Sequence, residues 1–253
     1  MGLLNKLGIG IGGGTTRSVS RPAAGIPAGG RLTPAGNGAH GAVGVTRVPE
    51  MQEMTRVSNG LKEFLWNLDG LGRGTMLDLG PAWQTTLSFF IERGFRVTSD
   101  DLLRSWKEFM KEEEVRLKNA AAGSESVDVT PAGRANRFIA ENLRYPESSF
   151  DAILVWDILD YLEPAIAKLT VACLTEFLRP GGIVFAMFHS KKPEGFQRYR
   201  VADSSTLQVI SAKPLCPAQR VYQNREIQDL FSRFRTVKSF VGRDQLRESL
   251  FVK

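Results

Sequence analysis

Three acids and a glycine between residues 75 and 101 have the types and spacing of a nucleotide-binding site. Asp78 and Gly80 lie at the end of a short apolar run, and Asp100 and Asp101 follow a second one. Strand, glycine turn, helix, strand and acid form the layout of a βαβ nucleotide-binding half. Free backbone amides at the turn favour a polar or anionic ligand group. Because a carboxylate at the tip of the second strand can accept from both ribose hydroxyls, the segment predicts an adenosine-type ligand and favours an enzyme.

Apolar periodicity predicts the elements that position these residues. Strands that alternate with helices indicate an α/β, doubly wound, Rossmann-like and mostly parallel sheet, with helices on both faces and an antiparallel strand pair at its C-terminal end. The predicted helices cover Pro49 to Leu68, Leu102 to Ala121, Ile166 to Leu178 and Gln228 to Phe234, the last preceded by Asn224 as its N-cap. The predicted strands cover Met76 to Leu79, Phe95 to Thr98, Arg137 to Leu143, Phe150 to Leu159, Ile183 to Phe188, Val237 to Val241 and Ser249 to Val252, with a loop from Ala122 to Ala135.

The basic excess of the chain lies mostly in its first 49 residues. The net charge is +6, and residues 1–49 hold five basic and no acidic residues, together with 13 of the 25 glycines. Such a segment cannot bury enough apolar surface to offset its ordering entropy, so we expect a disordered tail at 1–49. The predicted folded domain, residues 50–253, is nearly balanced in charge and gives no strong signal for nucleic-acid binding.

Composition argues against several other classes of protein. Cys173 and Cys216 do not have CxxC spacing, and the chain holds only two histidines, so we expect neither a disulfide scaffold nor a metal site. No apolar run approaches the roughly 20 residues that span a bilayer. No convincing secretory signal begins the chain, so a reducing, cytoplasmic setting is the default expectation.

The segment from Asn142 to Phe188 resembles the class I S-adenosylmethionine-dependent methyltransferases of the type 11-like kind. In that family a segment like Leu143 to Asp151 precedes the fourth strand, and one like Trp156 to Leu162 ends it. The family's LRPGG turn is present as Leu178 to Gly182, and a terminal antiparallel pair is a further shared trait. The resemblance covers roughly residues 50–253.

The resemblance implies S-adenosylmethionine as the cofactor and a small molecule as the methyl acceptor. It places the first-strand turn at the methionine end, Asp100 at the ribose hydroxyls with Asp101 as a substitute, and residues near Ile139 to Glu141 at the adenine. Asp157 would lie near the methyl group, and His189 would be the candidate base for a protonated acceptor. The implied cofactor-binding residues are Asp78, Gly80, Pro81, Ala82, Asp100, Asp101, Ala140, Glu141 and Asp157.

The first turn departs from the family pattern. Gly80 is followed by Pro81 and Ala82, where the family usually has further glycines, and Pro81 removes an amide donor. A non-catalytic protein of the same fold, binding a nucleoside ligand or a protein partner, is therefore an open alternative. A dinucleotide-dependent oxidoreductase is less favoured, because no GxGxxG follows the first strand.

Structural roles stay open for individual residues as well. Asp157 could be a helix N-cap, and His189 a strand-end residue without a catalytic role. Trp156, inside a buried strand, is expected in the core. The segment from Phe196 to Arg200 is expected to form a strand or flap over the site, with the gripping of an acidic acceptor or RNA as the alternative.

Overall fold

The computed structural model describes residues 53–121, 128 and 130–253. The tail predicted to be disordered, residues 1–49, lies outside them. Within the described part, one sheet has six strands in the order β3-β2-β4-β5-β9-β8. Its strands are β3 (Phe95–Ser99), β2 (Gly74–Asp78), β4 (Phe150–Trp156), β5 (Leu178–His189), β9 (Leu246–Val252) and β8 (Arg235–Val241).

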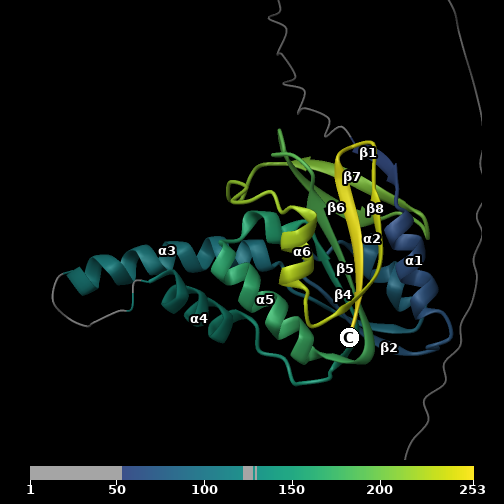
Figure 1. Ribbon diagram of the computed structural model, residues 1–253, viewed down its shortest axis with the longest axis horizontal. Coiled ribbons are helices and arrows are strands. Elements are labelled where there is room, and N and C mark those ends of the chain that lie inside the picture. Colours follow the sequence, from purple (N-terminus) through teal and green to yellow (C-terminus); the bar gives the residue numbers. More distant parts are fainter. Residues whose placement is uncertain (1–52, 122–127, 129) are drawn as a thin grey trace, which may run out of the picture. The chain divides into compact units, whose positions relative to one another are not determined.

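Four neighbouring strands of this sheet are parallel to one another, and β9 runs antiparallel to both of its neighbours. β2 pairs with β3 on one side and with β4 on the other, and β4 pairs with β5. All three pairings are parallel. β9 then pairs antiparallel with both β5 and β8. Figure 1 shows α1 (Asn59–Leu68) and α2 (Gln84–Ile91) on one face, and α5 (Pro164–Phe177) and α6 (Asn224–Leu230) on the other. The predicted fold class, with its C-terminal antiparallel pair, is confirmed.

β4 is almost entirely buried, as expected for a parallel strand covered on both faces. Ala152 to Trp156 are all buried, and β4 ends in the short 3₁₀ helix η1 (Ile158–Tyr161). The predicted strand therefore stops three residues early, at Trp156. This position matters because it places Asp157 at the carboxyl edge of the sheet.

A second sheet contains the antiparallel strands β1 (Glu53–Val57), β7 (Thr206–Ala212) and β6 (Phe196–Val201). β6 lies beside α2, where the Val201 amide donates to Thr86 Oγ1 at 2.9 Å. The predicted strand at Phe196 is confirmed. The predicted helix from Pro49 is wrong in part, because Glu53–Val57 pairs with β7 and α1 begins only at Asn59, with the Ser58 hydroxyl accepting from the Leu61 amide at 2.9 Å.

The predicted third strand, Arg137 to Leu143, is wrong: these residues belong mostly to the helix α4 (Pro131–Asn142). Thr130 caps this helix by accepting from the Gly133 amide at 3.0 Å, and Pro131 occupies its first turn. A threonine followed by proline is a helix-start pattern, so the predicted loop from Ala122 to Ala135 is wrong from Pro131 onward. Phe138 then packs with its ring centre 5.1 Å from Trp106 of α3 (Leu102–Ala121), whose predicted bounds are confirmed.

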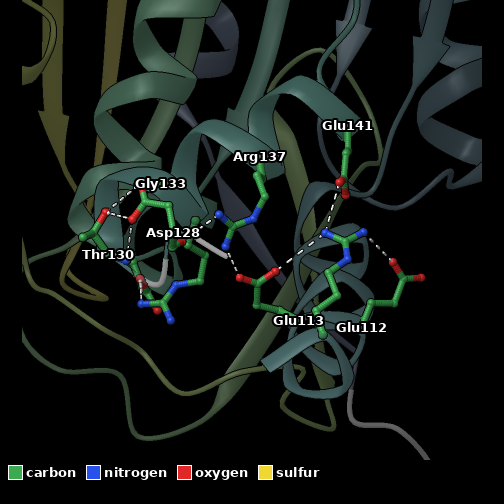
Figure 2. A network of polar contacts seen from close by, with 10 residues as sticks. Glu112, Glu113, Asp128, Thr130, Gly133, Arg137 and Glu141 are labelled. Atoms are coloured by element: carbon green, nitrogen blue, oxygen red, sulfur yellow. Dashed lines mark hydrogen bonds and ion pairs between the residues drawn. The ribbon is translucent and has the colours of Figure 1, made fainter. Parts of the chain in front are cut away.

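A polar network joins α3 to α4 (Figure 2). Glu113 of α3 has a side chain only 2% exposed and accepts from Arg137 of α4. Arg116 lies 3.6 Å from Glu113 and 3.1 Å from Glu141, so it connects the two helices as well.

α6 begins earlier than predicted, because a capping box formed by Gln223 and Glu226 replaces Asn224 as its N-cap. Among the described residues, no helix is long and apolar enough to span a bilayer.

Candidate functional site

Asp78 ends β2 and is buried, with 1% of its surface exposed. Its Oδ1 accepts from the Gly80 amide at 2.9 Å and from Trp156 Nε1 at 2.7 Å. Burial raises the pKa of the Asp78 carboxyl to about 6, although these two hydrogen bonds lower it. Its Oδ2 is buried and has no hydrogen-bond partner among the described residues. Asp78 thus carries an unsatisfied acceptor at the carboxyl edge of the sheet.

Gly80 lies directly beneath the indole of Trp156. A Cβ at this position would lie 2.6 Å from Trp156 Nε1, so the approach of the indole requires glycine here. Pro81 is half-buried and Ala82 is exposed, and both lead into α2. The first turn therefore keeps its glycine, but Trp156 covers it.

Trp156 was predicted as a core residue, and it is 3% exposed. Its ring stacks on Tyr199 of β6, with ring centres 6.2 Å apart and an interplanar angle of 12°. It also packs edge to face with Phe185 of β5, with the two ring centres 6.1 Å apart. The backbone of Trp156 has φ +56°, where the β4–β5 register shifts after Leu154. Local sequence patterns carry no signal for this placement, because the rings that contact Trp156 belong to β5 and β6.

Asp100 and Asp101 follow β3 but make different contacts. Asp100 is half-buried, and its Oδ2 accepts from the Tyr145 hydroxyl at 3.1 Å. Burial raises the pKa of Asp100, with the hydrogen bond from Tyr145 acting against it. Both oxygens of Asp101 accept from Arg198 Nη2 at 3.2 Å, and its Oδ1 also accepts from the Arg104 amide at the start of α3. Asp101 is thus engaged in structural contacts, whereas Asp100 uses only one of its oxygens.

Ala140 and Glu141 are exposed residues of α4 and not the tip of a strand. Glu141 lies 3.1 Å from Arg116 of α3. No hydrogen bond or ion pair of the described residues joins either of them to Asp78 or Asp100. The two residues thus lie on a helix instead of the strand expected here, and their role beside the adenine stays a prediction.

His189, the last residue of β5, lies between two buried carboxylates. Its Nδ1 lies 2.9 Å from Asp160 Oδ2, which also accepts from the His189 amide at 2.7 Å. Its Nε2 lies 3.8 Å from Asp157 Oδ2. Burial alone would lower the pKa of His189, but its hydrogen bond to Asp160 and the charges of Asp157, Asp160 and Asp244 together raise it. The structure thus joins the two residues predicted for catalysis, His189 and Asp157.

The two carboxylates differ in their partners. Asp157 is 3% exposed, and burial raises its pKa to about 7, against the lowering effect of the charge on His189. Its Oδ2 makes no hydrogen bond within the described part of the chain. The predicted alternative role is not seen, because the Asp157 side chain makes no N-cap hydrogen bond to η1. Asp160, which sequence reasoning missed, orients the imidazole and leaves Nε2 free to exchange a proton.

A cavity of about 350 Å³ opens beside His189. Charged side chains from three separate segments line it, including Arg56, Lys191 and Asp244. A polar small molecule could enter there and reach the imidazole. Across the described residues, no three histidine, cysteine or acidic side chains are arranged to hold a metal ion.

No protein-family model matches the sequence, and no curated protein matches it significantly. Among solved structures, the chain is similar to the Burkholderia thailandensis 1,6-didemethyltoxoflavin-N1-methyltransferase with bound 1,6-didemethyltoxoflavin and S-adenosylhomocysteine, at 17% identity and a TM-score of 0.45, over 77% of this chain and 78% of the other. An S-adenosylmethionine-dependent methyltransferase from Mesorhizobium loti matches at 14% identity and a TM-score of 0.44, over 76% and 96%. One from Methanosarcina mazei matches at 16% and 0.39, over 72% and 93%. Because these values are low, the fold assignment rests on the strand order itself.

Proposed function

We propose that this chain is an S-adenosylmethionine-dependent methyltransferase that acts on a small-molecule acceptor. One observation carries the proposal: Asp100, Asp78 and Asp157 stand at the carboxyl ends of three adjacent parallel strands, β3, β2 and β4. The chain turns to opposite sides of β2 at this point, and ligands of open α/β sheets bind at such a switch point. The side chains there are carboxylates, suited to ribose hydroxyls and to a cationic ligand group.

The ribose side of this site fits the proposed cofactor. Asp100 accepts one hydrogen bond, from Tyr145, and its other carboxylate oxygen is available for a ribose hydroxyl. The amino-acid side does not fit while Trp156 covers Gly80 and donates to Asp78. Trp156 must move before a ligand with an α-amino acid group can occupy this turn.

The acceptor side of the proposal rests on His189 and its neighbours. A hydroxyl or protonated amine in the adjacent cavity would give its proton to His189 Nε2, since Nδ1 is held by Asp160. Asp157, 3.8 Å from Nε2, would stabilise the imidazolium that forms. A charged, partly enclosed cavity of this size suits a polar small molecule better than a macromolecule.

Calorimetric titration with S-adenosylmethionine and S-adenosylhomocysteine tests the proposal, with NAD as the control ligand. We expect binding of the first two at micromolar concentrations and none of NAD. If a protein shown to be folded by circular dichroism binds neither sulfur nucleoside, the proposal is wrong.

A second candidate function is favoured by the position of Trp156. A non-catalytic protein of the same fold could keep the indole permanently over Gly80 and bind a nucleoside or a protein partner instead. The two candidates differ in whether the amino-acid end of the cofactor can enter, which calorimetry with ligands that carry or lack this end measures.

A further inference from the structure

Trp156 fills the position over the first turn in a way that a ligand could reproduce. Its Nε1 donates to Asp78 Oδ1 at 2.7 Å, and the indole lies directly on Gly80. One face of the ring stacks on Tyr199, and its edge meets Phe185. The side chain of the protein itself thus supplies an N–H to the buried carboxylate at the start of the turn.

The backbone of Trp156 indicates that this position is strained. A φ of +56° is rare for a bulky side chain and costs free energy. Such strain persists only where the surroundings hold it, and it gathers at ligand clamps and switch regions. Here the Tyr199 stack and the hydrogen bond to Asp78 hold the indole in place.

The second oxygen of Asp78 lacks a partner. Trp156 donates to Oδ1, whereas Asp78 Oδ2 is buried without a hydrogen bond among the described residues. The indole has one N–H and no charge, so it cannot satisfy both oxygens. An ammonium group has three donors and a positive charge, so it would complement this carboxylate better than the indole does.

We propose that Trp156 determines specificity at this site: it occupies the position of the ligand's α-ammonium group and must be displaced by a nucleoside ligand that carries an α-amino acid. A nucleoside thioether without that end binds with Trp156 in place. This inference rests on the proposed function, because it concerns how the same cofactor site accepts its ligand. Only molecules with the ring displaced bind the larger ligand, so its apparent Kd equals the intrinsic Kd divided by the fraction of molecules that are open.

Calorimetry on the full chain tests this with two probes that differ only at the relevant end. S-adenosylhomocysteine carries the α-amino acid, and 5′-methylthioadenosine lacks it. The variant Trp156→Gly removes the ring and tolerates the positive φ. We expect it to bind S-adenosylhomocysteine about tenfold more tightly than the wild type, with the affinity for 5′-methylthioadenosine changed by less than about threefold.

Trp66→Ala is the matched control, since Trp66 is 75% exposed on α1. This variant should leave both affinities unchanged. Equal or weaker binding of S-adenosylhomocysteine by folded Trp156→Gly overturns the role of Trp156 and leaves the proposed function intact. Failure of every folded variant to bind either probe overturns both proposals.

Tryptophan fluorescence gives a second readout that does not depend on the glycine variant. Adding S-adenosylhomocysteine to the wild type should shift the emission to the red, because Trp156 leaves its buried stack on Tyr199. The shift should be absent with 5′-methylthioadenosine and in Trp156→Phe. An unshifted wild type at saturating S-adenosylhomocysteine, or an equal shift in Trp156→Phe, contradicts the displacement.

Discussion

A single oxygen of Asp160 holds His189 at two points. Asp160 Oδ2 accepts from the His189 amide at 2.7 Å and lies 2.9 Å from His189 Nδ1. The backbone contact fixes the end of β5, and the side-chain contact fixes the ring and its tautomer. Asp160 therefore acts through His189, as a positioning residue for the proposed proton transfer.

Asp160→Asn should lower the pKa of His189. The hydrogen bond that the imidazole donates to Asp160 and the charge of Asp160 act against burial, so their loss moves the imidazole toward the neutral form. NMR titration of the ring protons measures this directly, and His40→Gln assigns the signal because the chain holds only two histidines. An unchanged or higher pKa in the folded variant would show that the carboxylate of Asp160 does not control the ring.

The stability of the protein should depend on pH through Asp78. Its pKa is raised from 3.8 to about 6, so the folded state binds the proton more tightly than the unfolded state does. Its contribution to stability is therefore present below pH 3.8 and is lost as pH rises toward 6. A rise of the Asp78 pKa from 3.8 to about 6 corresponds to about 3 kcal/mol of stability.

Asp78→Asn removes this titration. Urea unfolding at pH 4 and pH 7 should show that the free energy of unfolding of the variant, relative to the wild type, rises between the two pH values. The same difference at both pH values would mean that Asp78 has an ordinary pKa in the folded protein.

Asp100→Ala should weaken binding of S-adenosylhomocysteine by about 1–3 kcal/mol, because a carboxylate that accepts from ribose hydroxyls forms charge-assisted hydrogen bonds. Asp101→Ala is the matched control, since Asp101 contacts Arg198 and the start of α3 instead. That variant should lose folding stability and keep its affinity. Calorimetry distinguishes the two, and an unaltered affinity in folded Asp100→Ala would remove this residue from the site.

Gly80→Ala should destabilise the fold by about 1–3 kcal/mol, because its methyl group would overlap with Trp156 Nε1. The same substitution made in Trp156→Gly should cost much less, since the ring is gone. A double-mutant cycle from chemical denaturation measures the coupling. Additive effects of the two substitutions would show that the indole does not lie on Gly80 in solution.

Glu113→Ala should cost about 2 kcal/mol of stability, because its carboxylate is buried and Arg137 would lose a charge-assisted hydrogen bond. Glu112 is the matched control, as the preceding residue on α3 with a side chain 67% exposed. Glu112→Ala should change stability by less than about 0.5 kcal/mol. Equal effects in urea unfolding would argue against the network of Figure 2.

The sequence predicted elements where a local pattern was sufficient. The buried strand from Phe150, the helix Leu102–Ala121 and the terminal strand pair were identified because hydrophobic periodicity and turn residues act within a few positions. The third strand was wrong, because the cap at Thr130 and Pro131 outweighs the propensity of the residues that follow.

The sequence by itself determined that acids stand at the ends of neighbouring parallel strands, and so that Asp78, Asp100 and Asp157 reach one edge. Only the tertiary structure decided what those acids contact. Trp156 reaches Asp78 across 78 positions, and Asp160 reaches His189 across 29. Such contacts depend on strand order, on the register shift within β4 and on the placement of β6. Local patterns carry no record of these features, because packing between distant segments fixes them.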